Sequence, residues 1–220
     1  MNSQQHLLAP SGWRWWEVAL WAAIWATPLL LGGHAALIKE VAILALVALS
    51  LDLILGYAGI VSLGHAAFFG VGAYSAALLA KHVMPDPLAG LAVGMADGAL
   101  LGLLTSPMIE RGTDLTRLMV TMGVALVLFE LANKFDSLTG GADGLQGVVM
   151  HALFGRFEFD LGARVASFYS LAELFVAFLL LRRIVHSPLG VSLQALRDNR
   201  LRLSAASRAA ASAAVVARQR

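Results

Sequence analysis

Four polar side chains in otherwise apolar stretches are the residues best able to do chemistry in this sequence. Ser62 and His65 lie three positions apart among glycines, whereas Asp97 and Glu173 each lie near the middle of a long apolar run. Such groups can bind a polar solute, and ionisable groups in membrane segments usually face the interior of a helix bundle. They could line a substrate path. Alternatively, His65 is a hydrogen-bonded structural residue, and the two acids are protonated or paired with neighbouring helices.

The sequence lacks the motifs of common enzymes. It contains no GxxxxGK[ST] phosphate loop, so the chain cannot hydrolyse ATP by that route. It also contains no pair of catalytic carboxylates, no GxSxG turn and no HExxH pair. Because there is no cysteine, disulfides and thiolate metal sites are excluded. We therefore expect no enzyme activity, no metal and no cofactor, and energy for any work must come from a partner.

The composition indicates an integral membrane protein. Hydrophobic residues make up 59% of the 220 residues and charged residues only 14%, whereas a soluble domain is typically about 25% charged. The net charge of +2 is small, and the basic residues form no patch that would bind nucleic acid. The first apolar run has no convincing cleavage site after it, so we interpret it as a membrane span and not as a signal peptide.

The lengths of the apolar stretches predict an all-α, polytopic membrane helical bundle with about six transmembrane helices. A span requires roughly 20 apolar residues. The six stretches that approach this length are 15–31, 37–55, 62–80, 88–108, 115–133 and 164–181. Tryptophans at positions 13, 15 and 16 are expected to anchor the first span at the membrane surface.

Arginines near the ends of the spans predict the orientation of the chain. Cytoplasmic loops are enriched in Arg and Lys. Arg111 and Arg117 are placed in the loop after the fourth predicted span, and Arg182 and Arg183 follow the sixth. These two ends are therefore expected in the cytoplasm together with the amino terminus, and the loops after the first, third and fifth predicted spans are expected outside.

The fourth predicted span carries glycines at intervals of four residues. They are Gly90, Gly94, Gly98 and Gly102. Side chains at i and i+4 share a helix face, and small residues on one face let membrane helices approach closely. The pattern predicts tight packing against another helix of this chain or of a partner subunit. The alternative is a substrate groove lined by bare backbone.

The stretch that follows the second predicted span and continues into the third resembles a known family. It reads GYAGIVSLGHAAFFGVGAY from Gly56 to Tyr74. This is similar to the hallmark of the inner-membrane permease subunits of branched-chain amino-acid ABC importers, the LivM and LivH type, although many members carry Gln where this chain has Ile60. Backbone broken by glycine is tolerated at membrane depth only where protein or a cavity covers it. We therefore expect this stretch at the centre of the bundle.

A second run resembles the same family. TGGADGL, from Thr139 to Leu145, is similar to the TGGxxGL run that the family shows between the same two spans. It could contact a delivered substrate or its carrier. The alternative is a structured turn that caps a helix.

An amphipathic segment follows the sixth predicted span. Pro188 and Gly190 are expected to break the helix, and apolar residues then alternate with four polar ones. The polar residues are Arg197, Asp198, Asn199 and Arg200. The family has a similar SPxGxxLxAxRxNxxRxxA segment here, which implies that it couples the permease to an ATPase. From the residues alone, the helix could equally lie at the lipid headgroups.

The resemblance implies a multi-pass permease subunit of an ABC importer in the bacterial inner (plasma) membrane. Its substrates would be branched-chain or related amino acids, with urea or amides as alternatives. Its implied partners are ABC ATPase subunits, a second permease subunit, a periplasmic substrate-binding protein and the lipid bilayer, and no nucleic acid. The alternative function is a non-transporting permease fragment or membrane scaffold.

We divide the chain into a cytoplasmic amino terminus (1–14), a permease domain (15–205) and a tail (206–220). Family members normally continue with further spans after the amphipathic segment. The last residues here are rich in Ala, Ser and Arg and show no hydrophobic periodicity. The chain is therefore expected to be incomplete relative to the family and unable to transport alone, with a tail that a frameshift would explain.

Overall fold

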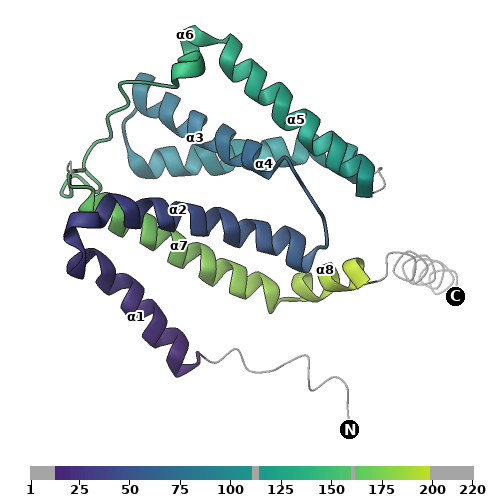
Figure 1. Ribbon diagram of the computed structural model, residues 1–220, viewed down its shortest axis with the longest axis horizontal. Coiled ribbons are helices and arrows are strands. Elements are labelled where there is room, and N and C mark those ends of the chain that lie inside the picture. Colours follow the sequence, from purple (N-terminus) through teal and green to yellow (C-terminus); the bar gives the residue numbers. More distant parts are fainter. Residues whose placement is uncertain (1–12, 111–113, 160–161, 199–220) are drawn as a thin grey trace, which may run out of the picture. The chain divides into compact units, whose positions relative to one another are not determined.

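The computed structural model describes residues 13–110, 114–159 and 162–198 of the protein, and this part of the chain is almost entirely helical or loop (Figure 1). The α-helices are α1 (Trp15–Leu30), α2 (Ala35–Asp52), α3 (His65–His82), α4 (Pro87–Glu110), α5 (Asp114–Lys134), α6 (Asp136–Thr139), α7 (Arg164–Val185) and α8 (Pro188–Asp198). An isolated β-bridge between Leu153 and Phe157 is the one strand-like pairing among the described residues. The predicted all-α fold is confirmed.

Each predicted span coincides with one of the longer helices. Three of them are long and apolar enough to cross a membrane, over Pro87–Pro107, Leu115–Lys134 and Arg164–Val185. By contrast, α1 has only 16 residues, and α2 carries Lys39 and Glu40 near its start and Asp52 at its end. A span needs about 20 predominantly apolar residues. The first three spans therefore remain predictions.

The chain forms two compact units. The terminal unit comprises residues 1–46 and 160–220, and the central unit comprises residues 47–159. In the central unit α3 packs along α4, α5 packs on both, and the short α6 follows the end of α5 (Figure 1). In the terminal unit α1 packs on α7, and α8 continues from the end of α7.

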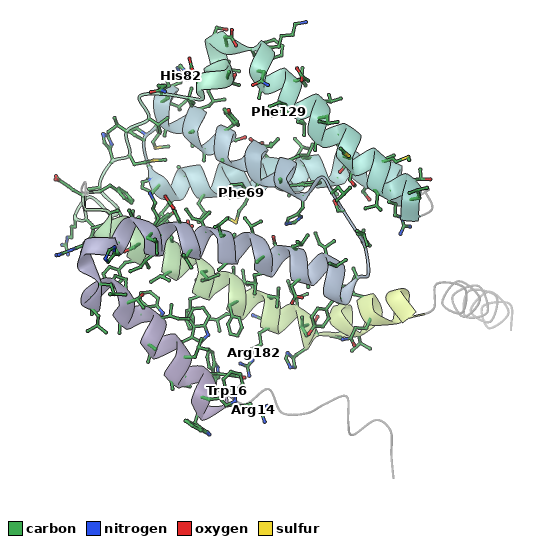
Figure 2. The ribbon with its side chains drawn as sticks, in the orientation of Figure 1. Arg14, Trp16, Phe69, His82, Phe129 and Arg182 are labelled. Carbon is green, nitrogen blue, oxygen red and sulfur yellow. The ribbon has the colours of Figure 1, made fainter. Side chains whose placement is uncertain are left out.

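Large apolar side chains lie on the outside of both units. In Figure 2 the labelled Phe69 and Phe129 belong to the central unit and Trp16 to the terminal unit, and their exposed fractions are 49%, 60% and 47%. Soluble monomers rarely expose broad apolar surfaces. Exposure of this kind is expected of helices whose outer faces contact lipid.

Candidate functional site

The glycine-rich motif forms a break between α2 and α3. After Asp52 the helix widens into a π-helical turn, η2 (Leu53–Tyr57), and residues 59–64 are not helical. Gly59 has a φ of +64°, a left-handed conformation that glycine adopts without steric cost. Because of this break α3 begins at His65, three residues later than the predicted start of the third span. Single π-helical turns are frequent at functional sites.

A threonine of α5 holds the broken backbone in place. The backbone N–H of Leu63 donates to Oγ1 of Thr121 at 3.2 Å, and that hydroxyl donates to the carbonyl of Leu118 at 3.1 Å. Gly64 is buried against the Thr121 backbone so closely that a Cβ would overlap the Thr121 carbonyl. Thr121 itself is only 4% exposed. Thr121 therefore packs on the break at Gly64 and at the backbone of Leu63, whereas Gly59 and the side chains of Val61 and Leu63 are exposed.

The space beside this contact is small. A cavity of about 10 Å³ is lined by Gly64, Phe68, Thr105, Val120, Thr121 and Val124. A cavity of that size holds at most one water molecule. This cavity therefore has no room for an amino acid.

His65 opens α3 and bonds to Ser50 of α2. Its Nε2 lies 2.7 Å from the Ser50 hydroxyl, and that hydroxyl also lies 2.8 Å from the Val47 carbonyl. The tautomer of the imidazole decides which of the two side chains donates in the Ser50–His65 bond. This bond bridges the two sides of the break and favours the structural alternative for His65. Direct contact with a substrate stays a prediction for His65 and for Ser62, which is half-buried in the non-helical segment.

The two acidic candidates lie in different units. Asp97 is half-buried on α4 in the central unit, and Glu173 is half-buried on α7 in the terminal unit. Tyr169, one turn before Glu173, donates a hydrogen bond to its carboxylate. Ser62, His65 and Asp97 thus belong to the central unit, and Glu173 belongs to the terminal unit. Tyr169 was missed by the sequence reasoning, although a polar pair at i and i+4 on one helix face could have revealed it.

The glycine face of α4 meets α3 over half of its length. A Cβ at Gly94 would lie 2.9 Å from the carbonyl oxygen of Gly72, and a Cβ at Gly72 would lie 3.2 Å from the oxygen of Gly94. One turn away, a Cβ at Gly90 would meet Ala76 at 3.5 Å. At this crossing the backbones of the two helices touch, which only small residues permit.

The other half of the face is open within the described chain. A Cβ at Gly102 would meet only the ring of Phe68, at 3.8 Å, and one at Gly98 would meet nothing within 4 Å. Packing of Gly98 against a partner subunit stays a prediction.

Leucine substitutions at Gly94 and Gly98 should separate packing against α3 from packing against a partner subunit. Gly94→Leu is expected to destabilise the fold, since overpacking typically costs about 1–3 kcal/mol. Gly98→Leu should leave the fold intact and weaken association with a second permease subunit. Size-exclusion chromatography of each purified variant, followed by pull-down of the partner, measures both effects. Full partner binding by a stable Gly98→Leu chain would show that this part of the face contacts lipid.

The TGGADGL run forms a structured turn at the end of α5. The Thr139 hydroxyl donates to the carbonyl of Phe135 at 2.9 Å, contacts that of Ala132, and accepts from the backbone N–H of Gly141 at 3.3 Å. Gly140 has a φ of +80°, typical of the glycine that follows a helix. These contacts favour the capping alternative for this run.

An open hollow lies between the α3–α4 turn and the loop that follows this cap. Its volume is about 740 Å³, and the backbone N–H of His151 fixes the loop by donating to the Pro85 carbonyl at 2.7 Å. Asp86 and Glu158 add carboxylates to a lining that is otherwise largely apolar. The size is within the range of small-molecule sites. No periodicity or motif in the sequence predicts this hollow, because most of its lining comes from an irregular loop.

A tight corner joins α7 to α8. Pro188 begins α8, and Gly190 lies inside the first turn of this helix. The prediction that Gly190 breaks the helix is therefore wrong. A Cβ on Gly190 would overlap the carbonyl of Val185, and would lie 2.8 Å from the oxygen of Ile184. Of the four predicted coupling residues, Arg197 and Asp198 lie in the last turn of α8, whose side chains are not described. Asn199 and Arg200, like the tail 206–220, lie outside the described residues.

Two arginines used to predict the orientation are in protein contacts. Arg117, predicted in a loop, lies in α5 and is only 4% exposed. Nη1 of Arg182 lies 2.7 Å from Oε2 of Glu17 on α1. Both arginines therefore contribute to packing between helices, in addition to the distribution of positive charge from which the orientation was predicted.

Long apolar helices, three of which are long and apolar enough to cross a membrane, place the chain among membrane proteins. Residues 34–209 match the family described as the permease component of the branched-chain amino acid transport system, and the chain belongs to this family. The resemblance noted in the sequence is confirmed.

Two curated relatives are similar to the chain. Both are named high-affinity branched-chain amino acid transport system permease protein LivM. The protein from Salmonella typhimurium is 29% identical over 179 residues, covering 70% of this chain and 41% of the relative. The protein from Escherichia coli is 28% identical with the same coverage. The chain thus spans about two-fifths of the length of these relatives. No solved structure matches it.

Proposed function

We propose that the chain is a permease subunit of an ABC importer in the bacterial inner membrane, and that it helps to translocate branched-chain or related amino acids. The observation that carries this proposal is the family match over residues 34–209, which includes both the glycine break and α8. The chain itself would supply the membrane path. Partner ABC ATPases would supply the energy, a second permease subunit would complete the path, and a periplasmic binding protein would deliver the substrate.

The glycine break is the proposed centre of the path. Non-helical backbone inside a membrane bundle exposes N–H and C=O groups, and it is tolerated where it lines a cavity or is covered by protein. Here Thr121 covers it on one side. We assign Ser62 and His65 to this region of the path, and Asp97 and Glu173 as further polar groups along it.

The corner after α7 is the proposed connection to the ATPase. The structure supports a defined position for the start of α8, because Gly190 lets its first turn sit directly against the last turn of α7. Arg197, Asp198, Asn199 and Arg200 would then form the docking surface at the other end of α8.

Co-expression with the partner genes tests the proposal. Cells lacking their own leucine uptake would receive the chain, two candidate ATPases, a second permease and a binding protein. Uptake of labelled leucine is expected only when all of them are present, and competition with urea or amides identifies the substrate class. Association with the ATPases without uptake of any of these solutes would instead favour the scaffold alternative.

Removal of the docking side chains gives a sharper test of coupling. The triple variant Arg197→Ala, Asn199→Ala, Arg200→Ala should insert normally but lose co-purification with the ATPase. The matched control is Lys39→Ala, Lys81→Ala, Lys134→Ala, which removes positive charge from the ends of the spans that are predicted to lie outside the cell. If the docking variant binds the ATPase as well as this control does, α8 lies at the lipid headgroups.

A further inference from the structure

The first helix lies outside the segment that matches the family, yet it is attached along α7. The family match begins at residue 34, and α1 ends at Leu30. Both helices belong to the terminal unit and pack against one another. The contact is antiparallel, since the start of α1 meets the end of α7 and the end of α1 is followed by Gly32, which faces Arg164 at the start of α7.

Aromatic side chains make the middle of this contact. The ring centroid of Trp21 lies 4.8 Å from that of Phe175 and 5.2 Å from that of Phe178. Further along α1, the ring of Trp25 stacks on Phe168 at 6.2 Å. Aromatic pairs at such separations attract one another beyond the area that they bury. These aromatic pairs, called the aromatic ladder below, therefore fix which face of α7 meets α1.

A charged clamp closes the contact at the end of α7 that leads to α8. Arg182 donates from Nη1 to Oε2 of Glu17 at 2.7 Å, and its guanidinium carbon lies 5.0 Å from the centre of the Trp13 ring. Figure 2 shows Arg182 reaching from α7 toward the first turn of α1, near Arg14. Charge-assisted hydrogen bonds and stacking on an aromatic face both require a defined guanidinium orientation. Less than a fifth of each charged side chain is exposed, at 17% for Arg182 and 18% for Glu17.

The backbone of the clamped arginine also belongs to the α7–α8 corner. Its carbonyl accepts a hydrogen bond from Nδ1 of His186 at 2.8 Å and one from the His186 backbone N–H at 3.2 Å. The next residue, Ser187, donates from its hydroxyl to the Ile184 carbonyl at 2.6 Å. Arg182 thus contacts α1 through its side chain and the corner through its backbone.

We propose that α1 is a brace that positions α8, with Trp13, Glu17 and Arg182 as the positioning residues. The aromatic ladder sets the rotation of α7, and the clamp fixes its last turn, from which α8 departs. Release of the clamp should let the corner and α8 move. The consequence for coupling rests on the function proposed for α8, whereas the mechanical connection does not.

The absence of cysteine from the sequence makes a direct test possible. Gln194 is an exposed residue of α8, so Gln194→Cys offers a single site for maleimide labelling of the full chain in inverted membrane vesicles. Glu17→Gln in this background is expected to change the labelling rate severalfold. The charge swap Glu17→Arg with Arg182→Glu should bring the rate back toward the wild-type value, which a purely local effect of either substitution would not do.

The neighbouring arginine provides the matched control. Arg183 is exposed, and Arg183→Ala removes a positive charge next to Arg182 without touching the Glu17–Arg182 ion pair. It should leave the labelling rate at Gln194→Cys unchanged. An equal rate in wild type and Glu17→Gln, or an equal change in Arg183→Ala, would overturn the brace.

Measurements on the assembled importer test the consequence for coupling. Glu17→Gln should lower the amount of leucine taken up for each ATP hydrolysed, with rescue by the charge swap. An altered labelling rate with an unchanged ratio would refute the role of the brace in coupling. If the wild-type assembly takes up no leucine, the proposed function fails, and the labelling experiment still decides whether α1 positions α8.

Discussion

Gly64→Ala is expected to lower the thermal midpoint of the purified chain by several degrees. The added methyl group would overlap the carbonyl of Thr121 and would lie 2.9 Å from its carbonyl carbon. Backbone atoms inside α5 cannot move aside as a flexible side chain could. Overpacking of this kind typically costs about 1–3 kcal/mol, and each kcal/mol shifts the midpoint of a chain of this size by about 2–4 °C. The shift can be measured by size-exclusion chromatography after heating in detergent.

A second glycine of the same motif serves as the control. Gly70 lies inside α3, and a Cβ there would meet nothing within 4 Å. Gly70→Ala should be neutral or stabilising, because alanine is favoured over glycine in a helix interior by about 1 kcal/mol. The two substitutions add the same methyl group and should act in opposite directions. A Gly64→Ala chain as stable as wild type would show that the break is not packed against α5.

Gly190→Ala should detach α8 from its position and weaken ATPase association at least tenfold, a change of about 1.4 kcal/mol. The methyl group would overlap the carbonyl of Val185 at the end of α7. Relief of that overlap requires the first turn of α8 to move away. The dissociation constant can be measured by titrating the ATPase onto the chain in nanodiscs.

Gly123→Ala is the matched control for this substitution. A Cβ at Gly123, on α5, would meet nothing within 4 Å, so the variant should bind the ATPase as wild type does. The labelling rate of Gln194→Cys should also change in Gly190→Ala and not in the control. Unchanged association and labelling in Gly190→Ala would mean that the corner tolerates a side chain and does not set the position of α8.

The helices could be predicted from the sequence because their length and composition are local properties. The predicted fourth and fifth spans differ from α4 and α5 by at most two residues at either end. The third differed more, since composition alone does not distinguish the non-helical residues Ser62 and Leu63 from the helix that follows. The conformation depends on Gly59 and on the hydrogen bond from Leu63 to Thr121, which is 58 residues away.

Contacts between distant segments could not be predicted. Glu17 and Arg182 are separated by 165 residues, and nothing in either local sequence identifies the other as its partner. The bond from His65 to Ser50 shows the same difficulty over 15 residues. The regular spacing of the glycines on α4 predicted one continuous packing face. It could not show that Gly94 touches α3 while Gly98 remains open.

The shortness of α1 has a consequence for the surrounding lipid. A helix of 16 residues is about 24 Å long, whereas the hydrocarbon layer of a bilayer is about 30 Å thick. If α1 spans the membrane, the bilayer must become thinner around it, or the tryptophans at its start must be drawn toward the interior. Because α1 is clamped to α7, this mismatch would act on α7 as well. The length of the lipid acyl chains sets the membrane thickness. A change in that thickness would then shift α7 and, through it, the position of α8.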